Sequence, residues 1–314
     1  MFFIQICDII NLYKGESMNA LNNPYLTIVN STNKYNEKDF EGLVYNQIPV
    51  TKGDRKKTSS FVEKQTHRAA IKAIQELISL GVKKETIEIS SAGRDDFDQE
   101  FAIDEFYKSE LAENGNNPQL ARQTTDEYCA KVGHSEHHSG LALDIKVPTK
   151  NMAIPKEIEQ TYNGDRYKGG LGFITKRLVM ERNGFILSYP LNSRLEQTTG
   201  VKHNEPWHWR YIGPEHSKRI AKLRDLVSTE EIVTREKIKL EEVLKEQQKT
   251  DPTLTDEKIN QKVNSVMFEE VFLEDYVKLL QLDIKADTEE ELLQEYADYF
   301  VKNILGYGEN FKLD

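Results

Sequence analysis

Two short stretches of the sequence contain side chains that could bind a metal ion and use it in catalysis. Residues 135–144 contain His137 and Asp144, and residues 205–211 contain His208, with Glu205 three positions before it. Two imidazoles and one carboxylate suit a catalytic zinc site, which leaves its fourth position to water. A glutamate that stays off the metal can then take a proton from that water. This set of residues therefore predicts a zinc peptidase.

The first stretch has the alternating pattern of a strand. Apolar side chains alternate with other residues over positions 141–147, a period of two that is typical of a half-buried strand. Asp144 should therefore project from the face opposite the leucines. Gly140 allows the preceding loop to turn tightly and to bring His137 back toward Asp144.

The second stretch contains a proline between the proposed base and the third ligand. Pro206 stiffens the link between Glu205 and His208, which suits a base that must lie beside the metal without binding it. The alternative is that the histidines are hydrogen-bonded core or surface residues. That alternative is common for a single histidine, but it does not account for the whole set.

Three other histidines lie near these motifs. His138 adjoins His137, and neighbours on an extended segment point in opposite directions, so we do not expect both to bind one ion. His134 and His203 could lie at the rim of the cleft or hydrogen-bond a ligand. They could equally be plain surface residues.

The two motifs resemble those of a known family. Ser-x-His-x-x-Gly-x-x-x-Asp at residues 135–144 and Glu-Pro-Trp-His-Trp-Arg-Tyr at residues 205–211 are similar to motifs of the VanY-type D-alanyl-D-alanine carboxypeptidases, a zinc group related to lysostaphin-like and hedgehog-like domains. The resemblance covers about residues 25–216. It includes Ser-Ala-Gly-Arg at residues 91–94, where the family usually has Ser-Gly-Tyr-Arg, so an aromatic side chain next to Arg94 is missing.

The resemblance implies a role for each of these side chains. It implies a zinc ion (Zn²⁺) bound by His137, Asp144 and His208, with Glu205 as the catalytic base. Arg94 would bind a carboxylate or stabilise the developing oxyanion, because a planar guanidinium suits both. The residues implied to contact substrate are Arg94, Gln99 and Ser135. Tyr189 and Trp207 are either core aromatics or walls of the substrate pocket, and we include both among the substrate-binding candidates.

The implied reaction is removal of the last D-alanine from a peptidoglycan stem peptide that ends in D-Ala-D-Ala. It needs no covalent intermediate, so we expect neither a serine nor Cys7 or Cys129 to act as a nucleophile. Two alternatives remain: a peptidoglycan endopeptidase of the endolysin type with the same zinc chemistry, and a metal-binding domain without catalysis. Glu205 and Arg94 argue against the second, because a structural metal site needs no base.

Composition excludes some partners. The formal net charge of the 314 residues is −10, and residues 214–314 contain 24 acidic and 15 basic side chains. Such a chain lacks the basic surface of nucleic-acid-binding proteins and is not suited to an anionic membrane surface. It has no apolar run long enough to span a membrane. The substrate implies the cell envelope or the extracellular space, but residues 1–13 make a poor secretory signal.

The sequence predicts an α+β fold with a small antiparallel sheet that holds the zinc site and is flanked by helices. Residues 26–29 resemble a leader strand of the family, and residues 148–164 read as a loop. We expect helices at residues 59–80 (ended by Gly81), 96–113 and 172–183, and strands at residues 85–91, 141–147, 185–187 and 208–212.

Three regions follow from these patterns: a poorly defined N-terminal leader (residues 1–24), a catalytic domain (residues 25–216) and an acidic α-helical C-terminal region (residues 217–314). In the last region, Ser228 and Glu231 have capping-box spacing, as do Thr288 and Glu291. We interpret this region as a stabilising cap, with a partner-binding arm as the alternative.

Overall fold

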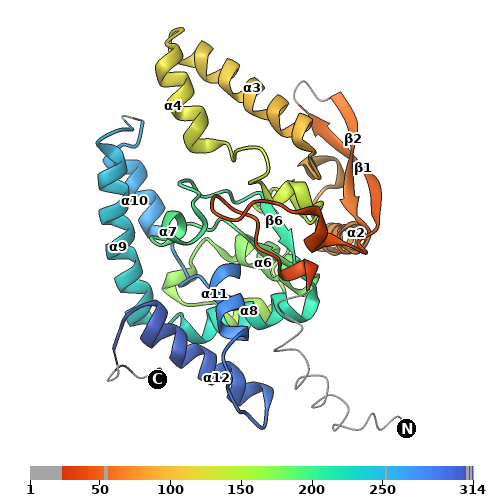
Figure 1. Ribbon diagram of the computed structural model, residues 1–314. Coiled ribbons are helices and arrows are strands. Elements are labelled where there is room, and N and C mark those ends of the chain that lie inside the picture. Colours follow the sequence, from red (N-terminus) through yellow and green to blue (C-terminus); the bar gives the residue numbers. More distant parts are fainter. Residues whose placement is uncertain (1–22, 53–55, 252, 309–310, 312, 314) are drawn as a thin grey trace.

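The structure is a computed structural model that describes residues 23–308, with gaps at 53–55 and 252, together with residues 311 and 313. Most of the predicted leader, including Cys7, lies outside the described residues. Figure 1 shows a mixed fold in which helices surround a small central sheet and a hairpin of two helices projects at one end.

The central sheet has four antiparallel strands in the order β3-β4-β6-β5. Leu143 and Ile145 of β4 and Trp209 of β6 are fully buried, which anchors both middle strands in the core. Helices and a small antiparallel sheet confirm the predicted α+β class. The strand bounds are β3 (Glu88–Ser91), β4 (Ala142–Lys146), β5 (Phe185–Leu187) and β6 (His208–Tyr211).

A separate hairpin corrects the prediction for the N-terminal part. Strands β1 (Tyr45–Lys52) and β2 (Lys56–Glu63) pair antiparallel, so residues 59–63 belong to a strand and not to the predicted helix. Helix α2 (Lys64–Ser79) begins only after Glu63, whose carboxylate accepts a hydrogen bond from the Thr66 amide at 2.8 Å. Glu63 therefore acts as the N-cap, satisfying an amide that a longer helix would have bonded internally.

The predicted leader strand is also wrong. Residues 24–26 form a short 3₁₀ turn that Asn23 caps, and residues 27–29 run on without strand pairing. The apolar side chains that suggested a strand are instead used for packing, because Leu26 and Val29 are both buried.

Two helices match their predictions closely. Helix α3 (Asp96–Glu113) has the predicted bounds, and α6 (Leu171–Arg182) differs from its prediction by one residue at each end. Gly81 has φ +92°, as expected of the residue that ends α2. Helix α4 (Pro118–Tyr128) pairs with α3 to form the projecting hairpin of Figure 1, and α5 (Lys156–Thr161) lies in the predicted loop. A short helix α7 (Leu195–Thr199) follows β5.

The C-terminal region is helical, as predicted. The capping box of Thr288 and Glu291 is present, whereas the one predicted for Ser228 and Glu231 is not. Thr229 caps α9 instead, because the Ser228 hydroxyl donates to the Arg224 carbonyl and accepts from the Glu269 amide. The helices are α8 (Pro214–Val227), α9 (Glu230–Gln248), α10 (Asp256–Asn264), α11 (Leu273–Leu280) and α12 (Glu289–Tyr299).

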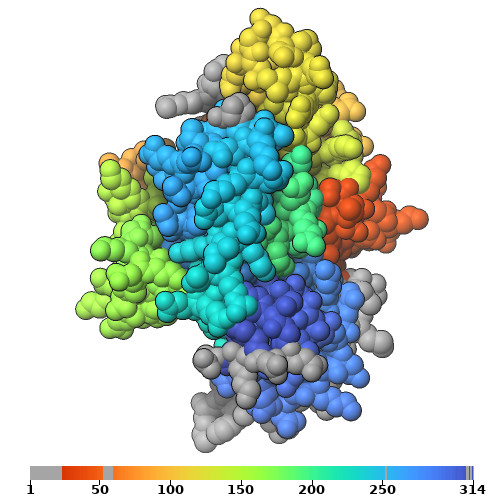
Figure 2. All heavy atoms as spheres, turned by 90° about the vertical axis from the view of Figure 1, so that its left-hand side faces the viewer, coloured from red at the N-terminus to blue at the C-terminus, as the bar shows by residue number. Residues whose placement is uncertain are grey.

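The C-terminal helices pack directly on the part that carries the sheet. One buried apolar cluster joins Ile186 and Ile212 to Tyr276 and Phe300. The Arg177 guanidinium on α6 makes two hydrogen bonds to the Glu270 carboxylate, at 2.7 and 2.6 Å. Figure 2 shows these helices, in cyan and blue, covering one side of the molecule. Residues on both sides of position 216 thus share a core.

Candidate active site

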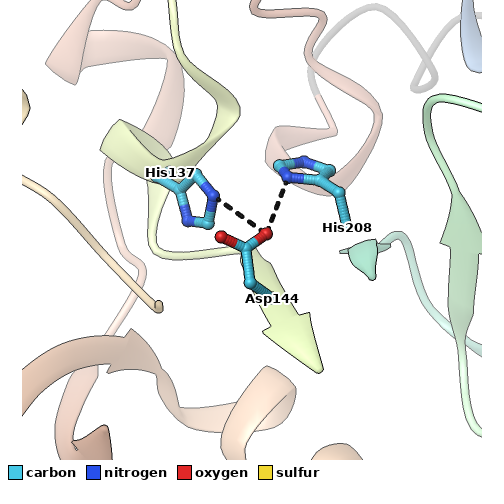
Figure 3. Close-up of side chains that lie close together, drawn as sticks. All are labelled: His137, Asp144 and His208. Atoms are coloured by element: carbon cyan, nitrogen blue, oxygen red, sulfur yellow. Dashed lines mark hydrogen bonds and ion pairs between the residues drawn. The ribbon is translucent and has the colours of Figure 1, made fainter. Parts of the chain in front are cut away.

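Three side chains from separate elements meet at one point. His137 lies in the 3₁₀ turn Glu136–Ser139, Asp144 in β4, and His208 at the start of β6, directly opposite Asp144 in the strand register. Asp144 Oδ1 lies 3.4 Å from His137 Nε2 and 3.2 Å from His208 Nδ1 (Figure 3). One ligand atom from each residue falls within 4.8 Å of the others, a spacing that suits one metal ion.

The hydrogen bonds of the two imidazoles decide which nitrogens can bind a metal. His137 Nδ1 lies 2.7 Å from the Ala92 carbonyl, to which it can only donate. Its Nε2 is therefore left with a lone pair, and this buried nitrogen makes no hydrogen bond to any described residue. His208 Nε2 lies 2.9 Å from Glu136 Oε2, so the proton belongs there and Nδ1 faces Asp144. Such outer partners fix the tautomer of a metal-binding histidine.

Sequence reasoning missed Glu136. It is buried, and its carboxylate also accepts a hydrogen bond from the Ser188 hydroxyl at 2.7 Å and lies 3.7 Å from Arg210 Nη1. Glu136 occupies a variable position of the first motif and meets His208 only after folding. The sequence signal that could have identified Glu136 was an acidic side chain next to a predicted ligand, in a segment that must be buried.

Electrostatics favour a cation between these groups. Burial lowers the pKa of His137 to about 4. Burial alone would also lower the pKa of His208, but hydrogen bonds to Asp144 and Glu136 outweigh it and raise that pKa to about 10. The same imidazoles hold the pKa of Asp144 well below its usual range despite its burial. Two nitrogens and a carboxylate in this setting fit a divalent ion such as Zn²⁺.

Glu205 lies beside the ligands. Its Oε2 is 3.7 Å from His208 Nδ1, and its backbone amide donates to the Tyr189 carbonyl at 2.9 Å. Burial raises the pKa of this carboxyl group to about 7. Its side chain is 24% exposed, so water can reach it. Glu205 thus lies next to the predicted ligand His208, and its role as a base stays a prediction.

Arg94 and Gln99 act as a pair. Arg94 Nη1 donates to Gln99 Oε1 at 3.0 Å, and Gln99 Nε2 donates to the Ala130 carbonyl at 2.7 Å. Gln99 is only 2% exposed, so its amide orients the guanidinium.

One cavity of about 230 Å³ brings most of the predicted site residues together, although Asp144 is not among the residues that line it. Trp207 is not among its lining residues and is 38% exposed. The lining includes Arg94, Gln99, Ser135, His137, Tyr189, Glu205 and His208.

Two further histidines and the described cysteine lie near the metal ligands but are not among them. Both ring nitrogens of His138 are used, because Nε2 accepts from the Gly133 amide and Nδ1 bonds the Arg94 carbonyl. His134 lines the cavity and bonds the Asn30 carbonyl at 2.9 Å. Burial raises the pKa of the Cys129 thiol to about 11, which makes it a poor nucleophile at neutral pH.

Comparisons with known proteins agree with this geometry. A profile of the VanY family, described as D-alanyl-D-alanine carboxypeptidase, matches residues 63–214. This segment is a VanY-type domain. It contains every ligand and catalytic candidate named above. No helix among the described residues is long and apolar enough to cross a membrane.

Individual relatives match over shorter stretches. A D-alanyl-D-alanine carboxypeptidase of Enterococcus faecium is 35% identical over 101 residues, which are 31% of this chain and 26% of that protein. The bifunctional D-Ala-D-Ala dipeptidase and carboxypeptidase VanXYC of Enterococcus gallinarum is 31% identical over 96 residues, 31% of this chain and 45% of that protein. The chain thus spans less than half of the length of either relative. A zinc-bound crystal structure of a vancomycin-resistance VanY D,D-pentapeptidase variant is 23% identical, with a TM-score of 0.46 and coverage of 63% and 94% of the two chains.

Proposed function

We propose that the protein is a zinc-dependent D,D-carboxypeptidase that removes the C-terminal D-alanine from peptidoglycan stem peptides or precursors ending in D-Ala-D-Ala. The observation that carries the proposal is that one cavity is lined by His137 and His208, a water-accessible carboxyl group and an oriented guanidinium, and that Asp144 completes the metal-ligand set with the two histidines. The relatives described as D-Ala-D-Ala carboxypeptidases support it. Such a substrate belongs to the cell envelope, where we expect the protein to act.

His137, Asp144 and His208 would hold the zinc ion. The buried His137 Nε2, which makes no hydrogen bond to any described residue, supports this assignment. When bound, zinc acidifies water toward neutral pH and polarises a carbonyl group.

Glu205 would act as the base and then as the acid. It takes a proton from water as the water oxygen adds to the carbonyl carbon of the penultimate residue. It returns that proton to the nitrogen of the terminal D-alanine as the carbon–nitrogen bond breaks. A water molecule is consumed, and a shortened peptide and free D-alanine are released.

Arg94 would recognise the substrate. Its guanidinium can form charge-assisted hydrogen bonds with the terminal carboxylate or with the oxyanion that develops on the attacked carbonyl. Gln99 holds the guanidinium in place at 3.0 Å. Ser135 and Tyr189, which line the same cavity, would complete the contact with the terminal residue.

Two further parts of the proposal concern organisation. We assign the chemistry to residues 25–216 and a supporting role to the helices of residues 217–314. A peptidoglycan endopeptidase with the same metal chemistry is the second candidate function, because the metal ligands and Glu205 would serve it equally well. Arg94 favours the carboxypeptidase, because an internal peptide bond has no carboxylate nearby.

Two synthetic peptides test the proposal. One ends in D-Ala-D-Ala with a free carboxylate, and the other is the same peptide amidated at its C-terminus. We expect zinc-loaded protein to release D-alanine from the first and to act far more slowly on the second, because Arg94 loses its charged partner. Equal cleavage of both peptides would favour the endopeptidase. Glu205→Gln is the matched inactive control.

A further inference from the structure

Two segments far apart in the sequence meet beside the active-site cavity. At the C-terminal end of α4, the Tyr128 ring stacks on the His203 ring with centroids 3.7 Å apart and planes 5° from parallel. Beside this stack, Lys202 Nζ lies 3.4 Å from Glu127 Oε1. We call these four residues the clasp.

The clasp lies at the cavity of the proposed active site. Two clasp residues, Glu127 and Tyr128, line that cavity, and so does Val201, which directly precedes Lys202. His137, His208 and Glu205 line it as well. A substrate whose terminal residue occupies the cavity would therefore meet the clasp if its chain continued further.

The strength of the clasp comes mainly from its aromatic part. The Lys202 and Glu127 side chains are 40% and 32% exposed, and an ion pair so accessible to water contributes little. A close parallel stack of two rings buries one face of each ring. Tyr128 also stacks on Phe106 of α3, with centroids 5.8 Å apart. The α3–α4 hairpin thus holds the tyrosine in place.

The C-terminal helices support the other half of the clasp. Lys262 Nζ of α10 donates to Asn204 Oδ1 at 3.4 Å, next to His203. Residues 202–204 also share a second cavity, of about 290 Å³, with α9 and with Lys262. These helices lie outside residues 63–214, which match the VanY profile. The clasp is thus supported partly by residues outside the VanY-type domain.

We propose that the clasp limits the cavity to a single residue beyond the scissile bond and so determines that the enzyme removes one terminal residue. This inference rests on the proposed D,D-carboxypeptidase function. Arg94 would recognise the terminal carboxylate, and the clasp would exclude a longer leaving group. Opening the clasp would let an extended chain pass between α4 and residues 200–204.

The rates at which one bond is hydrolysed in two substrates test whether the clasp excludes a longer leaving group. The parent peptide ends in D-Ala-D-Ala, and the extended peptide carries one further glycine. Mass spectrometry follows cleavage of the D-Ala–D-Ala bond, which yields D-alanine or D-alanyl-glycine. We expect the wild-type protein to prefer the parent strongly. Tyr128→Ala and His203→Ala should each raise the extended-to-parent rate ratio by about tenfold or more, because a steric barrier is removed.

Matched variants separate the clasp from general effects. Tyr107 lies on the same hairpin, where its ring contacts Arg122, and it is not among the residues lining the cavity. Tyr107→Ala should therefore leave the extended-to-parent rate ratio unchanged. Glu127→Gln should change the ratio less than Tyr128→Ala does. Each variant is checked for zinc content and melting temperature. If Tyr128→Ala does not fold, Tyr128→Leu and His203→Ala test the same contact.

The outcomes distinguish the two proposals. A wild-type protein that fails to release D-alanine from the parent would overturn the carboxypeptidase function and the clasp with it. A wild-type protein that releases D-alanine but cleaves the extended peptide equally well would overturn the clasp alone. An unchanged ratio in both folded, zinc-loaded clasp variants would do the same.

Discussion

The imidazole of His208 lies between two carboxylates, and this arrangement decides which of its nitrogens faces the metal position. Glu136 lies 2.9 Å from Nε2, and Asp144 lies 3.2 Å from Nδ1. A carboxylate behind a ligand histidine raises its basicity and holds its ring orientation. We therefore expect Glu136 to contribute to metal affinity as well as to local packing.

A conservative variant tests the charge of Glu136. Glu136→Gln keeps an oxygen that can accept from His208 Nε2 but removes the negative charge. We expect zinc affinity to fall by about 10- to 100-fold, the usual effect of losing such a partner. Competition with a chelator measures the affinity, and His137→Ala provides the reference for a lost ligand. Unchanged affinity would show that the charge of Glu136 does not act on the metal.

A substitution of Glu205 can separate catalysis from zinc binding. Because its carboxylate lies 3.7 Å from His208 Nδ1 and outside the ligand set, Glu205→Gln should keep zinc and the fold. The rate of hydrolysis should fall by about a hundred- to ten-thousand-fold, the range of a general base. Elemental analysis and a D-alanine assay on one preparation suffice. Loss of zinc would instead make Glu205 a ligand.

At the scale of elements, helix α11 is tied to the loop that lines the active-site cavity. Asn30 Nδ2 donates to Glu274 Oε1 at 3.0 Å, and Asn30 lines the cavity. Burial, with the negative charges of Glu136 and Asp275 added to it, raises the pKa of Glu274 to about 7. Ionising this carboxyl group therefore costs free energy in the folded protein.

The sign of this effect gives a pH-dependent prediction. A raised folded-state pKa favours the native state at low pH, and the benefit is lost as the pH rises through about 7. Glu274→Gln should thus stabilise the protein at pH 8, by about 1–3 kcal/mol at most for a partly exposed group, and hardly at pH 5. Urea unfolding at both pH values measures the difference. The exposed Glu290→Gln on α12 is the control, and equal effects at both pH values would contradict the prediction.

The elements also show what the sequence could and could not predict. His137, Asp144 and His208 were predictable because short motifs carry them and strand alternation orients Asp144. The partnership of Glu136 with His208 was not, because it joins positions 72 apart. Residues 59–63 were assigned to a helix because Phe61 fits the apolar stripe of the predicted helix as well as it fits a strand. Only pairing with β1 distinguishes the two.

At the scale of the whole molecule, buried ion pairs join the C-terminal helices to the catalytic part. Arg177 of α6 bonds both Glu181 and Glu270, and Arg194 bonds Asp275 at 3.0 Å. All of these side chains except Arg194 are at least nine-tenths buried. Removing one partner from such a group leaves an uncompensated charge in the core.

Arg177 is the place to test this connection. Arg177→Met should destabilise the protein by about 3–5 kcal/mol, because Glu270 loses its partner in a buried site. The double variant Arg177→Met with Glu270→Met should recover part of that loss, since no unpaired carboxylate remains there. Urea unfolding followed by fluorescence measures both. If the double variant is no more stable than the single one, the loss reflects packing and not charge.

The apolar cluster that spans position 216 also has a practical consequence for making the catalytic part alone. In the folded chain, Ile186, Ile212 and Ile220 are covered by residues of α11 and α12. A fragment that ends near residue 227 would expose this face to solvent, and exposed apolar surface of that kind promotes aggregation. A soluble minimal enzyme would therefore need polar replacements on that face, or α11 and α12 supplied as a separate chain.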